Sequence, residues 1–282
     1  MTAVATAHHF GPITAQRGPQ RAAAARMPAS GGPRKPLHLD GREQPIEVRA
    51  AGPTLAVAVG ARRMQFPLAR LSRILVRGRV RWDSDALSLC LGQQIPVVFL
   101  DSRARPIGAA LALLAQPSTV GELLADFVER PDWRACYENW LRNERFRVLF
   151  RWRRERAAVG APLAGAEWRE AVRAHVYVPD FYAPGSAAGE CYALALEMLS
   201  RAGVHAQYRS FDGTVLPLAA DLGRLLDLRV SLQVGTLGRH FDRHDQLTAR
   251  AFQEHAEEHE AFLVMLLGRL RARLGNLVEP WP

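Results

Sequence analysis

The stretch FPLARLSRILVRGRVRWDSDALSLCLGQQIPVVFLD, residues 66–101, decides the fold. Within it, SRILVRG (72–78) and VRW (80–82) are short apolar segments, and IPVVFLD (95–101) is a continuous apolar run of the kind found in buried strands. Between them, DSDALSLCLGQ (83–93) begins with capping residues and keeps a helical period. This order of strand, helix and strand predicts a small β domain with one helix.

The residues before this stretch extend the same β domain toward the N-terminus. IEVRAA (46–51), TLAVAV (54–59) and RRMQFP (62–67) are short segments broken by glycine or proline, and several alternate apolar and polar residues, as half-buried strands do. Residues 1–44 are rich in Ala, Gly, Pro and Arg without a hydrophobic period, which predicts a flexible basic tail. We therefore place the β domain at 45–111.

After Ile107 the pattern becomes helical to the end of the chain. The expected helices have no strand signals and are separated by proline- and glycine-containing breaks. They cover residues 108–116, 120–129, 132–158, 167–176, 187–203, 221–234 and 244–275. The fold class expected is α+β, with a small N-terminal β domain followed by an all-helical C-terminal domain at 112–282.

Charge and cysteine content indicate the kind of partner and compartment. The chain has 37 basic and 28 acidic residues, a formal charge of +9 and an isoelectric point near 10.4, which favours a polyanionic partner such as nucleic acid. The three cysteines, Cys90, Cys136 and Cys191, form no C-x-x-C pair, which predicts neither a disulfide framework nor a cysteine zinc site. The sequence contains no uncharged apolar run of about 18 residues, so we do not expect a membrane span. We expect a cytoplasmic protein.

A basic helix is the strongest candidate for nucleic-acid contact. WLRNERFRVLFRWRRER (140–156) interleaves arginines with aromatic residues. Such a stripe can follow a phosphate backbone, and each contact releases counterions. The alternative is a solvated charged face over a stripe made by Phe146 and Phe150. The candidate DNA-binding residues are Arg142, Arg145, Arg147, Arg151, Arg153, Arg154 and Arg156, of which Arg147, Arg151 and Arg154 share one helical face.

Three blocks of this sequence resemble the CRISPR-associated integrase family called Cas-one. The block at 66–111 has the family's spacing of strand and turn residues, NWLRNERFRVLFRW (139–152) is similar to a family helix, and GVHAQYRSFDGTVLPLAADLGRLL (203–226) is similar to the family's metal-site block. In the first block the matching residues are Leu71, Ile74, Gly78, Val80, Ala86, Leu87, Ile95, Pro96, Val97, Phe99, Leu100, Asp101 and Gly108.

The resemblance implies a metal-dependent DNA endonuclease or integrase, in which a glutamate, a histidine and an aspartate hold Mg²⁺ or Mn²⁺. Aligned on Gly213, the family's aspartate falls on Asp221, which is the remnant catalytic and metal residue. The histidine position holds Phe211, which cannot ligate a metal, and His205 is out of register. No segment matches the family's glutamate helix, and Glu144 and Glu155 are poor substitutes.

Two readings of this site follow from the resemblance. One is a catalytically degenerate homologue that binds DNA in spacer acquisition as a scaffold or accessory protein. The other is an active endonuclease or integrase whose ligands have moved, with His205 beside Asp221. Asp221 could also be the N-cap of a helix over 221–226. The family further implies a homodimer formed through the β domain, and the small Cas-two protein as a partner.

A histidine cluster supports a third class of function, a zinc hydrolase. His240, His244, His255 and His259 lie within twenty residues, and HAEEH (255–259) has the H-x-x-E-H pattern of inverted zinc peptidases. On a helix His255 and His259 would share one face, with Glu258 as the base. The alternative is a solvated polar helix face, since no third zinc ligand is placed.

Overall fold

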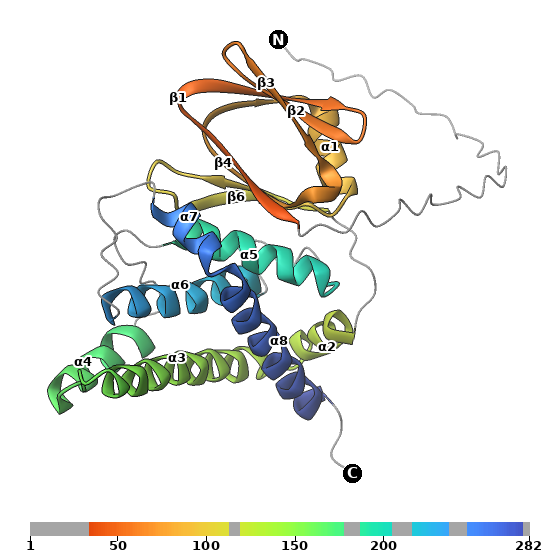
Figure 1. Cartoon of the computed structure of the whole chain (residues 1–282). Helices are drawn as coiled ribbons and strands as arrows, with labels where there is room; N and C mark the ends of the chain where they lie inside the picture. Colours follow the sequence, from red (N-terminus) through yellow and green to blue (C-terminus); the bar gives the residue numbers. More distant parts are fainter. Residues whose placement is uncertain (1–33, 113–118, 178–186, 205–215, 237–246, 279–282) are drawn as a thin grey trace, which may run out of the picture. The chain divides into compact units, whose positions relative to one another are not determined.

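A computed structural model describes residues 34–112, 119–177, 187–204, 216–236 and 247–278. All of them belong to one compact unit, Gly32–Pro282. A six-stranded sheet with one helix is followed by a series of helices, and the expected α+β fold is confirmed (Figure 1). No helix in the described ranges is long and apolar enough to cross a membrane.

The sheet is mixed, with the strand order β3-β2-β1-β4-β5-β6. β1 and β4 pair in parallel, as do β4 and β5, and the other neighbours are antiparallel. The helix α1 lies between β4 and β5 in the chain and begins after Asp83, whose side chain caps it. The bounds are β1 (Lys35–Ala51), β2 (Thr54–Val59), β3 (Arg62–Pro67), β4 (Leu71–Trp82), α1 (Ser84–Gly92), β5 (Val97–Leu100) and β6 (Pro106–Ala110).

The helical part follows the predicted segments, with differences at three of them. Its elements are α2 (Thr119–Val128), α3 (Trp133–Ala158), α4 (Gly165–Val176), α5 (Ala188–Arg201), α6 (Leu218–Thr236), α7 (Leu247–Glu254) and α8 (Ala256–Val278). The single helix expected over 244–275 is interrupted at His255. The helix expected over 221–234 begins at Leu218, and the segment expected to be helical from residue 108 begins as the strand β6.

The N-terminal boundary of the β domain also differs from the prediction. β1 begins at Lys35, so residues 35–44 are part of the sheet and not of a tail that reaches residue 44. The cause is visible in the strand, where Leu37 and Leu39 are buried on one face while Asp40 is exposed. Residues 1–33 lie outside the described residues.

Alternation along the central strands gives the sheet two covered faces. Ile74, Val76 and Val97 belong to the core of the β part, whereas Leu75 and Val98 belong to the core formed with the helices. This explains why β4 and β5 are apolar without a break in sequence: both of their faces are buried. The helix that packs against β4, β5 and β6 is α5.

Charged residues join α5 to the sheet. Arg73 on β4 donates to Glu197 on α5 at 2.6 Å, and both side chains are buried. His38 on β1 lies 3.3 Å from Glu190, also on α5. Burial raises the pKa of the Glu190 carboxyl, and His38 and then Arg73 oppose that rise. Because a buried ion pair is costly to break, these contacts fix which face of the sheet α5 covers.

Candidate functional site

Asp221, the residue at which the family resemblance places a metal ligand, lies in the first turn of α6. Its amide donates to the carbonyl of Pro217 at 3.0 Å, so it is part of the helix, and the alternative of an N-cap at 221 is wrong. The carboxylate is buried. Tyr137 of α3 donates its hydroxyl to Oδ2 at 3.0 Å, and Arg224 donates to Oδ1 at 3.2 Å.

The surroundings of Asp221 act on its charge in opposite directions. Burial raises the pKa of the carboxyl, and this effect exceeds the lowering by Arg224, Tyr137 and Arg145. Burial, and then the charge of Asp221, raises the pKa of Tyr137 well above its usual value, so the phenol remains a donor. The guanidinium groups of Arg224 and Arg145 therefore compensate the charge of the carboxylate only in part.

The described residues do not fit the divalent cation that the family resemblance implies. In the described ranges no three His, Cys, Asp or Glu side chains converge as a metal site would require. Glu144 and Glu155, the two glutamates considered as replacements for the missing metal ligand, instead form ion pairs with arginines. Glu144 is 1% exposed and accepts from Arg147 and Arg269, while Glu155 accepts from Arg151 at 2.9 Å. The positions His205, Phe211 and Gly213 lie outside the described residues.

The seven candidate arginines of α3 divide among different surroundings. Arg142 and Arg153 lie over the rings of Tyr177 and Trp168, on the side of α4. The charge of Arg145 lowers the pKa of the Asp221 carboxyl. Arg156 lies over Trp152 and donates to the carbonyl of Ala161 at 3.0 Å. Arg147, Arg151 and Arg154 are exposed on the face that the sequence predicts. The arginines therefore do not form a single stripe.

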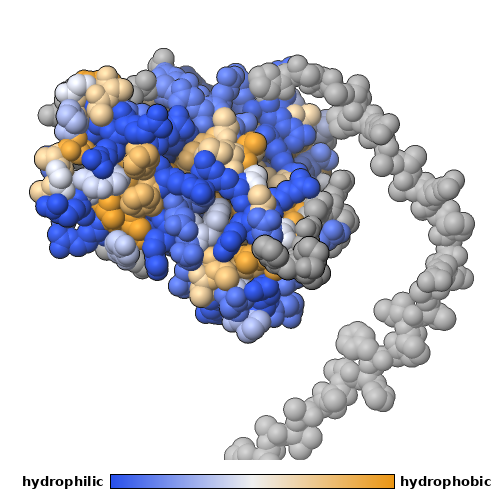
Figure 2. Space-filling view, turned by 90° about the horizontal axis from the view of Figure 1, so that it is seen from below, coloured by the Kyte–Doolittle hydropathy of each residue, from blue (hydrophilic) through white to orange (hydrophobic). Residues whose placement is uncertain are grey.

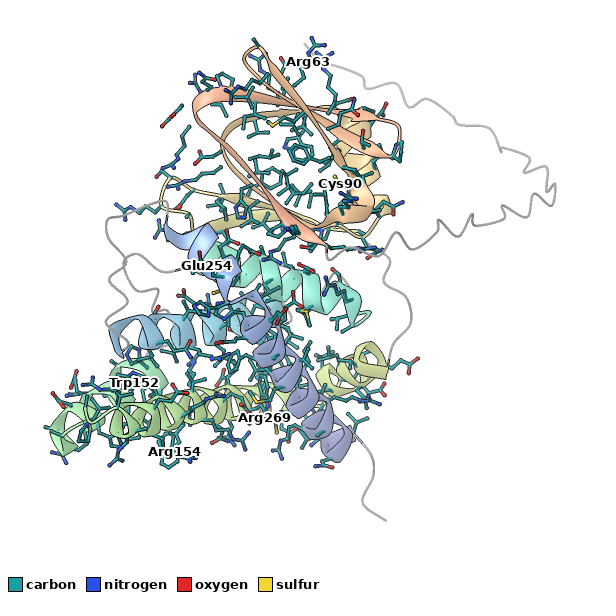
Figure 3. All side chains as sticks on the ribbon, in the orientation of Figure 1. Arg63, Cys90, Trp152, Arg154, Glu254 and Arg269 are labelled. Carbon is teal, nitrogen blue, oxygen red and sulfur yellow. The ribbon has the colours of Figure 1, made fainter. Side chains whose placement is uncertain are left out.

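A pocket between α3, α6 and α8 gathers two of these arginines with two from other helices. Its cavity volume is about 130 Å³, and it is open to solvent. Figure 3 labels Trp152 on α3 and Arg269 on α8, which both line it, and Arg154, which does not. The lining residues are Arg147, Val148, Arg151, Trp152, Glu155, Arg229, Leu232, Gln233, Phe262, Met265 and Arg269.

The arginines of this pocket differ in how far they are buried. The side chains of Arg147 and Arg151 are 57% and 62% exposed, that of Arg269 is 38% exposed, and that of Arg229 only 10%. Arg229 lies over the ring of Phe262 at 4.9 Å and donates to the carbonyl of Glu258 at 3.0 Å. Burial, and next the charge of Arg151, holds the pKa of the Arg229 guanidinium below its usual value. The pocket therefore concentrates positive charge.

The buried carboxylate of Glu144 organises one wall of the pocket. Arg147 Nη1 donates to one of its oxygens at 2.5 Å, and Arg269 Nη1 donates to the other at 2.8 Å. These two charge-assisted bonds tie α3 to α8 and hold two guanidinium groups at the pocket. The sequence could have suggested the first bond, because Glu144 and Arg147 are three apart on a helix. It held no signal for Arg269, which is 125 residues away.

The histidine pair of the proposed zinc motif lies in unequal surroundings. The rings of His255 and His259 are 6.3 Å apart, and Glu258 lies 3.7 Å from His255 and 3.8 Å from Arg229. His259 is buried against Phe252, with ring centroids 4.4 Å apart. Burial, followed by the charge of Arg229, lowers the pKa of His259 to about 4. This geometry is that of a core histidine. His240 and His244 lie outside the described residues.

Comparisons with known proteins give one family match and several structures of similar fold. Residues 42–125 match the family model described as CRISPR associated protein Cas1. No curated protein sequence matches the chain.

The similar structures share little sequence with the chain. TM1797, a CAS1 protein from Thermotoga maritima, has a TM-score of 0.61 at 12% identity, over 85% of this chain and 96% of that one. A casposase bound to integration product has a TM-score of 0.56 at 12% identity, over 86% and 90%. TtCas1 in a complex with DNA has a TM-score of 0.52 at 16% identity, over 88% and 93%. At such identities these likenesses establish the fold.

Proposed function

We propose that the chain belongs to the Cas1 family, which the match of residues 42–125 supports, and that it binds DNA in CRISPR adaptation as a scaffold or accessory protein. It acts in the cytoplasm as a homodimer joined through the β domain, with the Cas2 protein as its partner. This proposal takes its DNA partner from two supports: the DNA in the complexes of similarly folded proteins, and the basic surface of this chain.

The observation that carries the proposal is the exposed positive charge on α3. Arg147, Arg151 and Arg154 repeat at helical spacing on one face, which can follow the phosphates of a duplex or of a single strand. Figure 2 views the molecule from below Figure 1, where α3 and α8 lie, and hydrophilic residues cover much of that face. Each phosphate contact releases counterions, so the affinity should depend steeply on salt.

The scaffold role is supported by the partners of Asp221. A divalent cation would have to compete with the Arg224 guanidinium for this carboxylate, and burial already disfavours its charged form. A lone carboxylate binds Mg²⁺ weakly even without that competition. What Asp221 does in this arrangement is to join α6 to α3 through Tyr137.

DNA binding is tested by fluorescence anisotropy with a labelled duplex over a series of salt concentrations. Replacing Arg147, Arg151 and Arg154 by Ala should weaken binding and reduce the slope of log affinity against log salt by about 2 to 3. The charge-matched control replaces Arg62, Arg63 and Arg70, which are exposed in the β part, by Ala. If the α3 variant keeps both the affinity and the slope of the wild type, α3 is not the DNA surface.

The scaffold role is tested by a half-site integration assay with Mg²⁺ or Mn²⁺. We expect no strand transfer from protein that binds the DNA substrate. Asp221→Asn, which retains an acceptor for Tyr137, should leave DNA affinity unchanged. The active-integrase alternative predicts the opposite: strand transfer by the wild type that is abolished in Asp221→Ala and Asp221→Asn, with both variants folded by thermal melting. That result would overturn the scaffold role.

A further inference from the structure

The pocket between α3, α6 and α8 differs from the exposed face of α3 in having a buried cationic base. Arg229 is nine-tenths buried, and its Nε has no hydrogen-bond acceptor among the described residues. A guanidinium has five N–H donors, and leaving one buried without an acceptor costs free energy unless a ligand supplies that acceptor. The pocket therefore has an unsatisfied buried donor, and its four arginines face only three carboxylates, Glu144, Glu155 and Glu258.

The rest of the lining defines the chemistry of an acceptable ligand. Arg147, Arg151 and Arg269 surround Arg229, and Glu155 is the one carboxylate among the lining residues. An oxyanion with several acceptor oxygens suits such a group of planar donors. Trp152, which is only partly buried, adds aromatic surface on which a nucleobase can stack, whereas the ring of Phe262 is buried and lies under Arg229. A single nucleotide has both of these groups, a phosphate and an adjacent base, and therefore suits the pocket.

The shape of the site favours a chain end over a continuous backbone. A phosphodiester in mid-strand has one negative charge and must enter and leave along an open surface, as the exposed face of α3 permits. A phosphate monoester has a charge of about −1.5 to −2 at neutral pH and three strong acceptor oxygens. It ends the strand, so it can enter a pocket whose base is closed by Arg229.

We infer that this pocket binds a single nucleotide through its terminal phosphate monoester, with the base against Trp152. The inference deepens the proposed DNA binding and rests on it where the nucleotide is the end of a DNA strand. A free mononucleotide presents the same group and is the second source of this chemistry. Glu144 is a positioning residue here, since it holds Arg147 and Arg269 at the pocket.

The experiment compares short single strands that differ only at one end. Anisotropy is measured with strands that have a phosphate or a hydroxyl at the 5′ end, and likewise at the 3′ end, and each is competed with 5′-deoxyadenosine monophosphate and with inorganic phosphate. We expect about a tenfold preference for one phosphorylated end. Arg229→Gln and Arg269→Gln should abolish the preference. Arg63→Gln, an exposed arginine of β3 outside both the pocket and the α3 face, should keep it.

The outcomes separate this inference from the proposed function. Equal affinity for phosphate and hydroxyl ends, without binding of the mononucleotide, overturns the pocket and leaves DNA binding by α3 intact. Loss of the preference in Arg63→Gln as well also overturns it. If no strand binds but the mononucleotide does, and Arg269→Gln removes that binding, the pocket stands while the proposed function fails. Arg269 is partly exposed, so its variant remains informative if Arg229→Gln fails to fold.

Discussion

At the scale of single residues, buried charge is managed by specific partners. Glu144 is almost fully buried yet accepts from two arginines, and Asp221 accepts from a phenol and a guanidinium. Such groups are stable in a core because their hydrogen bonds and opposite charges replace water. His259 differs, since its Nδ1 is buried without a hydrogen-bond partner among the described residues.

His259 should make stability depend on pH. Its pKa in the folded protein is about 4, below the usual 6.5, so its contribution is complete above pH 6.5 and is lost as the pH falls toward 4. This difference between the unfolded and folded pKa values corresponds to about 3 kcal/mol of unfolding free energy. In urea unfolding, the free-energy difference between wild type and His259→Phe, which keeps the packing on Phe252, should shift by that amount between pH 7 and 4. A constant difference would contradict the lowered pKa.

The sequence could identify candidate residues but not their contacts. Asp221 was located by its spacing from Gly213, and the α3 arginines by composition. Tyr137 and Arg269 had no signal because each meets its partner across 84 or 125 residues of chain. Long-range contacts of this kind come from packing, which periodicity does not encode.

At the scale of elements, helices and strands with a strong local sequence pattern were predicted correctly, and a segment with a weak pattern was not. The continuous apolar run at β5 and the long basic helix α3 were predicted within two residues of their ends. Residues 108–110 of β6 were expected to be helical, as the start of the segment GAALALLAQ (108–116). Their strand conformation comes from pairing with β5, a tertiary effect that overrides local propensity.

The close approach of β1 to β4 depends on Gly41 and Gly78, which pair with each other. Gly78 has φ +77°, and a Cβ there would lie 2.6 Å from the amide nitrogen of Arg42. Gly52 has φ +60° with no atom within 4 Å of such a Cβ, so it provides a control for backbone strain alone. We expect Gly52→Ala to cost about 1 kcal/mol of unfolding free energy and Gly78→Ala at least about 2 kcal/mol more.

Thermal and urea unfolding of both variants measure these costs. The two substitutions add the same methyl group at a left-handed position, so the difference between them reports the steric contact of β1 with β4. Equal destabilisation would mean that β1 and β4 can move apart at this point without a further cost in unfolding free energy.

At the scale of the whole molecule, α5 joins the sheet to the helices. Its buried charges meet β1 and β4, and Gly189 brings it close to the turn before β6, where a Cβ would lie 2.5 Å from the carbonyl oxygen of Ala104. The predicted division into domains at residue 111 is thus bridged by one helix, and both parts share a compact unit.

A matched pair of helix variants tests how tightly this junction packs. Gly268→Ala on α8, where a Cβ would meet nothing within 4 Å, should stabilise the protein by about 0.5–1 kcal/mol through helix propensity. Gly189→Ala makes the same change on α5 but should destabilise it by about 2 kcal/mol through overpacking. Differential scanning calorimetry gives both. Stabilisation by Gly189→Ala would show that α5 can shift away from the sheet.

The parallel pairing of β1 with β4 has a consequence for synthesis of the protein on the ribosome. Lys35 pairs with Leu71 and Val48 with Trp82, so the first strand finds its central neighbour only after β2 and β3 have been made. Until then, the nascent hairpin of β1 and β2 exposes Leu37 and Leu39, which are buried in the finished sheet. A chaperone that binds apolar strands would therefore find its target in this early segment, and release it when residue 82 has emerged.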